Sequence, residues 1–408
     1  MSTESLTRSP LLPLKSAIEH MLQVCPKITQ TEEVTIFDAL NRVVAKNITS
    51  TLSVPPSDNS AMDGYAFYCE DSLPQGTDFL LSGQSLAGNP FAGKLTHDKC
   101  VRITTGAILP APFNTVMMQE NIDIQGDKIV LKQSVTAGNS VRRAGEDIRC
   151  GETVLSLGKR LMPADLALLA SLGIDKVCVF RKPKVAIIAT GDELVEAGTS
   201  LEPGQIYESN SVALHGLLSY QGADILHYGI VKDDPKLIED TLIDASKSAD
   251  IVLSCGGVSV GDADYVKQVL SDIGQINFWK VAIKPGKPFA FGNIGQAIFC
   301  GLPGNPVSSY VTFEKLVVPL LTHMSSVKQE TKHHITASCS ETLIKRPGRA
   351  DFQRGIAFQD EDGAWWVKPN GKQGSGIMTS IANANCYILL EQQQGNVAKG
   401  TKVKIELF

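Results

Sequence analysis

The sequence predicts a multidomain α/β protein built around a mostly parallel, doubly wound sheet, and three observations support that prediction. The chain has 408 residues, which is enough for about two or three domains. Apolar runs alternate with helical patterns between residues 184 and 321, as they do in right-handed βαβ units. The stretches 67–147 and 330–408 instead have the short, turn-rich runs of β modules.

The central stretch, residues 181–327, is expected to form the parallel sheet. Predicted strands lie at 185–189, 224–231, 250–257, 278–284 and 297–302. Predicted helices lie at 211–220, 235–246, 263–270 and from 306 to about 321. Alternation of this kind places helices on the faces of the sheet.

The flanking stretches complete the predicted domains. Residues 1–53 and 148–180 are expected to form an N-terminal helical region, with a β-rich module inserted at 54–147. In the helical region, apolar spacing predicts three helices, the first around Leu14, Ile18, Met21 and Leu22, the second around Ile36, Leu40, Val43 and Val44, and the third within 161–174. Residues 328–408 are expected to form a small barrel or sandwich.

Composition excludes several classes of protein. The net charge of −5, with both signs interspersed, disfavours a nucleic-acid partner. Nine cysteines are scattered without a CxxC pair, so we expect a reducing, cytoplasmic compartment and no zinc knuckle. The N-terminus does not resemble a signal peptide, and no apolar run is long enough for a membrane span.

Glycines and carboxylates follow each predicted central strand. Ligands of open α/β sheets bind beyond the carboxyl ends of the strands, so these residues define a candidate site. They are Thr190, Gly191, Asp192 and Glu193; Lys232, Asp233 and Asp234; Gly256 and Gly257; and Gly301, Leu302, Pro303, Gly304 and Asn305. Each could alone be a turn former or helix cap, but their convergence on one sheet edge favours a site.

The segment SCGGVSVGDADYV (254–266) resembles a phosphate loop with negative charge. Its glycines let backbone N–H groups approach an anion, whereas Asp262 and Asp264 would repel one unless a cation lies between. Mg²⁺ commonly bridges carboxylates and phosphates, so Asp264 is a candidate ligand while Asp262 could be a helix cap. The segment is neither a P-loop nor a GxGxxG motif, which argues against a nicotinamide dehydrogenase.

Two lysines share one face of the predicted strand at 278–284. Lys280 and Lys284 would lie about 13 Å apart along an extended backbone and could hold a diphosphate. The alternative is that both face solvent on an edge strand and protect it from aggregation.

Nine ordered motifs resemble the MoeA family, the molybdopterin molybdenumtransferases, which includes the E domain of gephyrin and a plant homologue. They span nearly the whole chain: NSAMDGYA (59–66), VRITTGA (101–107), VRRAGEDI (141–148), ATGDEL (189–194), DDP (233–235), SCGGVSVGDADYV (254–266), FWKVAIKPGKPFAFG (278–292), GLPGNPVS (301–308) and GRADFQRG (348–355). A set of this length is far more specific than any single motif.

The resemblance implies an enzyme of the last step of molybdenum cofactor synthesis. Such an enzyme takes adenylated molybdopterin and molybdate, releases AMP and uses Mg²⁺. It also implies four domains, with an α/β domain of the molybdopterin-binding type and a C-terminal β-barrel. Members are elongated homodimers whose cleft lies between the α/β domain of one subunit and the N-terminal module of the other.

The resemblance also implies roles for matching residues. Asp264, with Asp233 or Glu193, would bind Mg²⁺; Lys280 and Lys284 would hold the phosphates; and Glu193 or Asp147 would orient molybdate or relay protons. The remaining substrate-binding residues would be Asp63, Thr105, Arg142, Arg143, Asp192, Gly256, Gly257, Ser259, Gly301, Pro303, Gly304, Arg354 and Ser375, with Glu146 beside them. Of these, Asp63, Thr105, Arg142, Arg143, Glu146 and Asp147 would come from the partner subunit.

Two other functions stay open at this point. A molybdopterin adenylyltransferase shares the α/β domain and its glycine loop, but the additional N- and C-terminal domains argue against it. A gephyrin-like scaffold is the other alternative; retention of every charged motif favours catalysis instead. Contact with the adenylyltransferase is an expected partnership.

Overall fold

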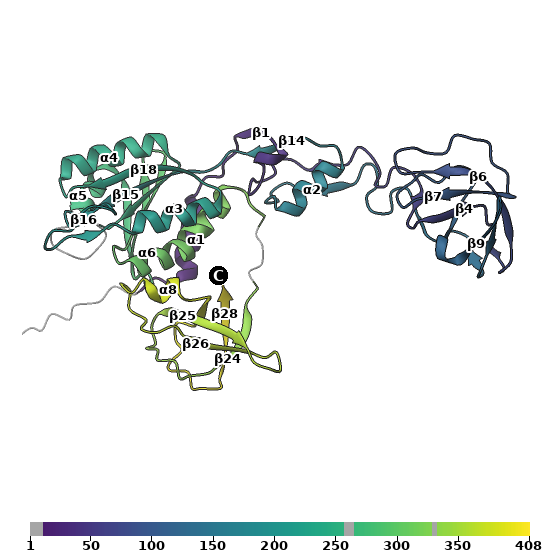
Figure 1. The fold of residues 1–408 in the computed structure, drawn as a ribbon. Helices are drawn as coiled ribbons and strands as arrows, with labels where there is room; N and C mark the ends of the chain where they lie inside the picture. The colour runs from purple at the N-terminus through teal and green to yellow at the C-terminus, as the bar shows by residue number, and fades with distance from the viewer. Residues whose placement is uncertain (1–10, 257–264, 329–332) are drawn as a thin grey trace, which may run out of the picture.

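The computed structural model describes residues 11–256, 265–328 and 333–408. Figure 1 shows an elongated molecule in which the α/β domain and the C-terminal domain lie together at one end. The β-rich module lies at the other end, and a small region around helix α2 (Pro163–Ser171) connects the two. Residues of the module are therefore far from the central sheet of their own chain.

The central sheet has six strands in the order β18-β15-β19-β23-β22-β20. Their bounds are Asp224–Val231, Lys184–Thr190, Ile251–Cys255, Ala297–Leu302, Pro288–Ile294 and Gln275–Lys280. The first four are parallel neighbours, and β22 pairs antiparallel with both β23 and β20, so β20 runs in the same direction as the first four. Every residue of β19 and β23 is buried, as expected for parallel strands covered on both faces.

Helices cover both faces of this sheet because successive strand residues point to opposite sides. Val185 and Ile187 of β15 pack with α1 (Leu14–Val24), α3 (Asn210–Gln221), α6 (Pro306–Thr312) and α7 (Val318–Met324). Ala186 and Ile188 pack on the other face with α4 (Pro235–Ser248) and α5 (Tyr265–Ile273). A π-helical turn, η3 (Phe313–Val317), joins α6 to α7.

The predicted single strand at 278–284 is wrong. Its first part is the end of β20, which pairs with β22 in the central sheet. Its last part is β21 (Ile283–Lys284), which pairs in parallel with β25 of the C-terminal domain. Between the two parts, Ala282 donates its N–H to Leu12 O at 2.7 Å and to neither sheet. The chain passes here from the central sheet to the barrel. The two lysines thus belong to different sheets and do not share a strand face.

The N-terminal region is less helical than predicted. Helix α1 is confirmed, but the second helix is wrong, because only the short 3₁₀ turn η1 (Ile36–Asp38) forms there. Asn41 has a φ of 63°, which ends helical geometry, and Val43 and Val44 then form β-bridges. The apolar residues that suggested this helix therefore include two that pair as strand residues. The region is completed by two small antiparallel sheets, β1–β14 (Thr31–Thr35, Lys176–Phe180) and β2–β13 (Ile48–Thr49, Thr153–Leu155).

The inserted module is a six-stranded sheet in the order β8-β4-β7-β6-β10-β9. The bounds are Thr115–Met118, Gly64–Phe67, Lys99–Ile103, Asp78–Ser85, Lys128–Leu131 and Ile122–Gln125. Separate apolar clusters around Phe67 and Val101 form its core. Two short pairs join other parts of the module, β3–β12 (Asn59–Ser60, Val141–Arg142) and β5–β11 (Ser72–Leu73, Val135–Thr136).

The C-terminal domain is a closed barrel, which decides between the two predicted architectures. Strands β24 to β28 pair in the ring β25-β26-β24-β28-β27, and β27 pairs back to β25. The bounds are Ile335–Cys339, Ala350–Gln359, Trp365–Pro369, Cys386–Leu390 and Lys402–Leu407. Strand β21 extends the barrel from outside, so the barrel is joined to the α/β domain by backbone pairing.

Candidate active site

The four parallel strands end at one edge of the central sheet. Gly191, after β15, donates its N–H to Val231 O at 3.4 Å, and Gly256, after β19, donates to Leu302 O at 3.2 Å. The turns after neighbouring strands are therefore held against each other by the backbone. The predicted convergence of strand-end residues is observed for the described ones.

A carboxylate cluster lies at this edge and consists of Asp192, Glu193 and Asp233. The Asp233 N–H donates to Asp192 Oδ1 at 3.2 Å. Burial and the charges of Asp192 and Glu193 raise the pKa of Asp233 above its ordinary value. Gly191, with φ 149°, has no Cβ; one placed there would lie 2.6 Å from Glu193 Oε2. The positive φ favours glycine at this turn, whereas the flexible end of Glu193 could move away from a Cβ.

Two other glycines pack the neighbouring turns closely. Gly256 has a φ of 101°, and a Cβ there would lie 3.0 Å from Thr190 O. A Cβ at Gly304 would lie 3.9 Å from the Cα of Gly256, so the β19 and β23 turns are adjacent. Gly301 and Pro303 are buried in and just after β23 and support this edge. Of the predicted loop residues, Gly257, Ser259, Asp262 and Asp264 lie outside the described residues.

The helix predicted at 211–220 is α3, but sequence reasoning missed Asn210, its first residue, as a candidate site residue. Asn210 donates its Nδ2–H to Gly304 O at 2.8 Å, which ties the helix to the β23 turn. Its Oδ1 atom is buried and has no hydrogen-bond partner within the described part of the chain. Glu208 accepts a hydrogen bond from the Ser211 N–H at 2.9 Å. The available signal was a Glu-Ser-Asn-Ser run before a helix, a pattern typical of N-termini.

The two predicted phosphate-binding lysines differ in environment. Lys280 ends β20 with an exposed side chain. Lys284, in β21, has its Nζ 3.0 Å from Asp351 Oδ2 of the barrel. The side chain of Lys284 is 38% exposed, whereas that of Asp351 is 2% exposed. The positive charge of Lys284 is thus already opposed by a buried carboxylate.

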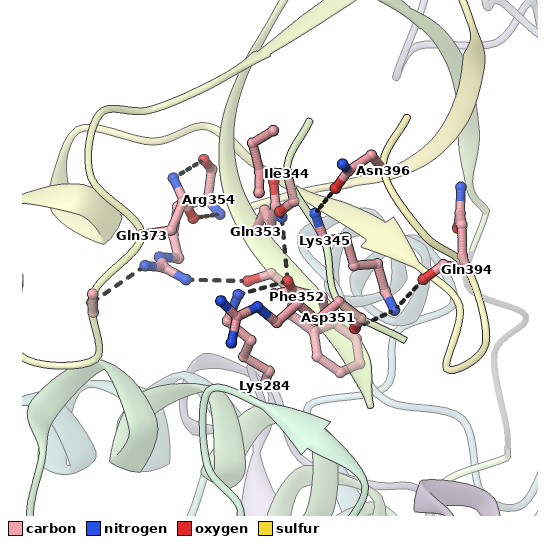
Figure 2. A network of polar contacts seen from close by, with 12 residues as sticks. Lys284, Ile344, Lys345, Asp351, Phe352, Gln353, Arg354, Gln373, Gln394 and Asn396 are labelled. Carbon is pink, nitrogen blue, oxygen red and sulfur yellow. Dashed lines mark hydrogen bonds and ion pairs between the residues drawn. The ribbon is translucent and has the colours of Figure 1, made fainter. Parts of the chain in front are cut away.

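The barrel reaches the sheet edge through one loop. Ser375 accepts a hydrogen bond at its carbonyl oxygen from the Val307 N–H at the start of α6, at 3.0 Å. Arg354 is buried, and its guanidinium donates to Ser380 Oγ at 3.1 Å and Gly374 O at 3.3 Å. Figure 2 shows Arg354 beside Gln373, whose Oε1 accepts a hydrogen bond from the Arg354 N–H at 2.9 Å. Arg354 therefore holds the loop that places Ser375 beside α6.

The module contains two polar pairs joined over long sequence distances. Asp63 Oδ1 accepts hydrogen bonds from the Thr105 N–H at 2.7 Å and the Thr105 hydroxyl at 2.9 Å. The same Thr105 groups, first the N–H, lower the pKa of Asp63. Arg143 donates to Asp58 Oδ2 at 2.6 Å, and its backbone N–H donates to Glu146.

Most of the predicted module residues thus have hydrogen-bond partners within the module, and all of them are exposed. Arg142 lies in β12, and the Asp147 N–H donates to Val54 O at 3.1 Å. The module lies at the far end of the molecule from the α/β domain (Figure 1). One chain therefore gathers the predicted residues in two separate groups.

The donor chemistry of the sheet edge suits Mg²⁺, which prefers carboxylate oxygens. Asp233 and Glu193 supply such oxygens, and burial, followed by the charges of Asp192 and Glu193, raises the pKa of Asp233. No group of three acidic, histidine or cysteine side chains within the described ranges is arranged to hold a metal ion.

The fold defines a multidomain α/β protein with a candidate ligand site at the carboxyl edge of the sheet and a β-barrel beside it. Three family models match the chain: the MoeA N-terminal region at 12–173, a probable molybdopterin binding domain at 186–323 and the MoeA C-terminal region at 336–408. The chain belongs to the MoeA family of enzymes, the molybdopterin molybdenumtransferases. This membership supports a role in molybdenum cofactor biosynthesis.

Relatives and solved structures agree with that assignment. The chain is 44% identical to a molybdopterin molybdenumtransferase of Haemophilus influenzae, over 98% of this chain and 99% of that one. It is 32% identical to gephyrin of Dictyostelium discoideum, over 98% of this chain and 62% of that one. A crystal structure of the Pyrococcus horikoshii molybdopterin biosynthesis protein MoeA superposes with a TM-score of 0.84 at 32% identity, covering 98% of this chain and all of that one.

The helices in the described ranges include none that is long and apolar enough to cross a membrane.

Proposed function

We propose that this protein inserts molybdate into adenylated molybdopterin with release of AMP, in an Mg²⁺-dependent reaction that forms the molybdenum cofactor. The observation that supports the proposal most directly is the carboxylate cluster of Asp192, Glu193 and Asp233 beside the glycine turns of the sheet edge. Glycine turns favour phosphate groups, and clustered acids favour a cation between themselves and those phosphates.

Lysines beside this edge would stabilise the charge that develops as AMP leaves. When the phosphoanhydride bond breaks, negative charge accumulates on the departing phosphate, and fixed cations lower the energy of that state. Lys280 is exposed at the end of β20. Lys284 is held by Asp351 with part of its side chain exposed. We expect both ammonium groups to contact the phosphates.

Asp233 and Glu193, with Asp264 of the loop outside the described residues, would hold Mg²⁺. Bound there, the cation would offset the charge of the phosphates. Addition of Mg²⁺ should therefore raise the melting temperature of the wild-type protein more than that of an Asp233→Asn variant. A ligand that binds the folded state stabilises it more when its affinity is higher.

A homodimer would bring the module of one chain to the sheet edge of another. Within one chain the two residue groups are at opposite ends (Figure 1), and a two-fold dimer can juxtapose distant surfaces reciprocally. Asp63, Thr105, Arg142 and Arg143 would then bind substrate across the interface. Asp147 or Glu193 would orient the attacking molybdate.

The experiment is incubation of the protein with adenylated molybdopterin, molybdate and Mg²⁺, with AMP as the readout. Molybdate-dependent AMP release is the expected result. Consumption of ATP with metal-free molybdopterin would instead support an adenylyltransferase, and no turnover in either assay would support a scaffold. Asp264→Ala and Lys280→Ala should both lose activity; full Mg²⁺-dependent turnover in both would contradict the site assignment.

A further inference from the structure

A partly buried ion pair joins the barrel to a lysine of the candidate site. Lys284 Nζ lies 3.0 Å from Asp351 Oδ2, and the same oxygen accepts a hydrogen bond from Gln353 Nε2 at 3.2 Å. Gln353 is itself fixed, because its Nε2 also donates to Ile344 O at 3.0 Å. Figure 2 shows Asp351 and Gln353 of β25 with Lys284 and Ile344 beside them. The carboxylate thus has a defined position before any ligand binds.

The pairing leaves Lys284 able to bind an anion as well. An ammonium group has three N–H donors, and Asp351 is the one ion-pair partner recorded for Lys284 within the described ranges. With 38% of its side chain exposed, the lysine can direct further donors outward. Asp351 can therefore fix the rotamer of Lys284 without occupying all of its donors.

A second lysine, Lys345, belongs to the same polar network (Figure 2). Lys345 is 3% exposed, and its Nζ donates to Gln394 O at 2.8 Å and to Gln392 O at 3.3 Å. Burial lowers the pKa of Lys345, while Asp351 acts to raise it and Lys284 to lower it further. Lys345 is thus held by backbone carbonyls, whereas Asp351 pairs with Lys284, whose exposed side is where an anion would bind.

We propose that Asp351 is a positioning residue, which orients the Lys284 ammonium toward the anionic substrate and so makes the barrel part of the active site. The inference rests on the proposed function, because the substrate phosphate is the expected ligand of Lys284. Preorganised charge is more effective than mobile charge because no reorientation is needed in the transition state.

A double-mutant cycle tests the proposal. Asp351→Asn should lower kcat/KM for AMP release about tenfold when Lys284 is present, because a misplaced group contributes less. In the Lys284→Met background, measured under single-turnover conditions, the same substitution should have no further effect. An equal loss in both backgrounds would overturn the proposal, since a purely structural role of Asp351 does not depend on Lys284.

Thermal stability gives a readout that does not need activity. Lys284→Met leaves Asp351 buried without its counter-ion, so its melting temperature should fall, and adding Asp351→Asn should restore part of the loss. If the double variant instead melts at or below Lys284→Met, the two residues are not coupled and the proposal fails. Should Asp351→Asn not fold alone, Asp351→Glu replaces it in the kinetic cycle with the same two outcomes.

The chain offers a matched control at the same domain junction. Lys315 of η3 pairs with Glu406 of β28 at 2.8 Å, and the lysine is 8% exposed. Glu406→Gln should lower the melting temperature while kcat/KM changes less than about twofold. A tenfold loss in this variant would show that any weakened barrel contact impairs activity, which would overturn the specific role of Asp351. Failure of wild-type AMP release would instead contradict the proposed function itself.

Discussion

The sheet edge of the α/β domain and the polar pairs of the β-rich module organise functional groups in different ways. At the sheet edge, four adjacent strands deliver their turns to one place, and Gly191 and Gly256 close the turns through backbone hydrogen bonds. In the module, side chains hold each other, as in the pairs Asp63–Thr105 and Asp58–Arg143. Negative charge is therefore concentrated at the sheet edge, whereas in the module hydrogen-bond donors stabilise Asp63 and a cation pairs with Asp58.

The largest effect should come from breaking the carboxylate cluster. Asp233→Asn should lower Mg²⁺-dependent AMP release about 100-fold, because it removes a charge that would face the cation and phosphates. The neighbouring Asp234 caps α4 by accepting the Leu237 N–H at 2.9 Å. Asn is an equally good cap, so Asp234→Asn should keep wild-type activity. Equal losses in the two variants would contradict the distinction between cluster and cap.

A second prediction tests whether the two regions meet in a dimer. Asp63→Ala and Asp233→Asn should each be nearly inactive, but mixing the two proteins after subunit exchange should restore activity. Half of the dimers would then be mixed, and one of the two clefts in each would be intact, so about a quarter of wild-type activity is expected. AMP release measured before and after exchange provides the comparison. No recovery, with mixed dimers shown to form, would contradict a shared cleft.

The α/β edge could be predicted because its geometry follows from strand order. Runs such as 185–189 and 224–231 are long and apolar, and parallel strands necessarily end at the same edge. The residues after them were therefore expected to converge, as Asp192 and Asp233 do through the Asp233 N–H. Asn210, which was missed, is the first residue of a helix. Its distance from the β23 turn depends on tertiary packing, which a local sequence pattern does not predict.

The errors have the same origin in tertiary contacts. The apolar spacing around Ile36 and Val43 fits a helix, but the chain forms β-bridges to distant residues there instead. Tertiary pairing can override local propensity. Lys280 and Lys284 share parity in the sequence, but the chain changes sheets between them. The Lys284–Asp351 pair spans two domains, and the Asp63–Thr105 pair joins separate motifs, so neither could be derived from spacing.

A smaller effect is expected from the module. Thr105→Val removes the hydroxyl that donates to Asp63 at 2.9 Å but keeps the backbone N–H donor. Asp63 should then stay ionised and lose some order, which should raise KM about threefold, the value of one modest hydrogen bond. Thr104→Val is the neighbouring control; its hydroxyl accepts the Ala87 N–H at 3.2 Å. A larger rise in KM for Thr104→Val would contradict the assignment of Asp63.

The smallest effect concerns stability, where the two regions should respond to pH with opposite signs. The pKa of Asp233 is raised by burial and by Asp192 and Glu193. Its charge therefore disfavours folding at neutral pH, and this cost disappears as pH falls through the folded-state pKa. Asp233→Asn should melt about 1 °C above wild type at neutral pH, an effect limited by solvent screening, and the difference should vanish near about pH 4.

Asp58 provides the opposite case in the module. The Ala144 N–H, followed by Arg143, lowers the pKa of Asp58 below its ordinary value. Its charge therefore stabilises the fold above the unfolded-state pKa, and that contribution is lost as pH falls through the folded-state pKa. Asp58→Asn should melt slightly below wild type at neutral pH, with the gap narrowing in acid. Calorimetric scans of both variants from neutral to acidic pH measure the contrast. Melting-temperature differences of the same sign in the two variants would contradict the distinction between a strained carboxylate at the sheet edge and a stabilised one in the module.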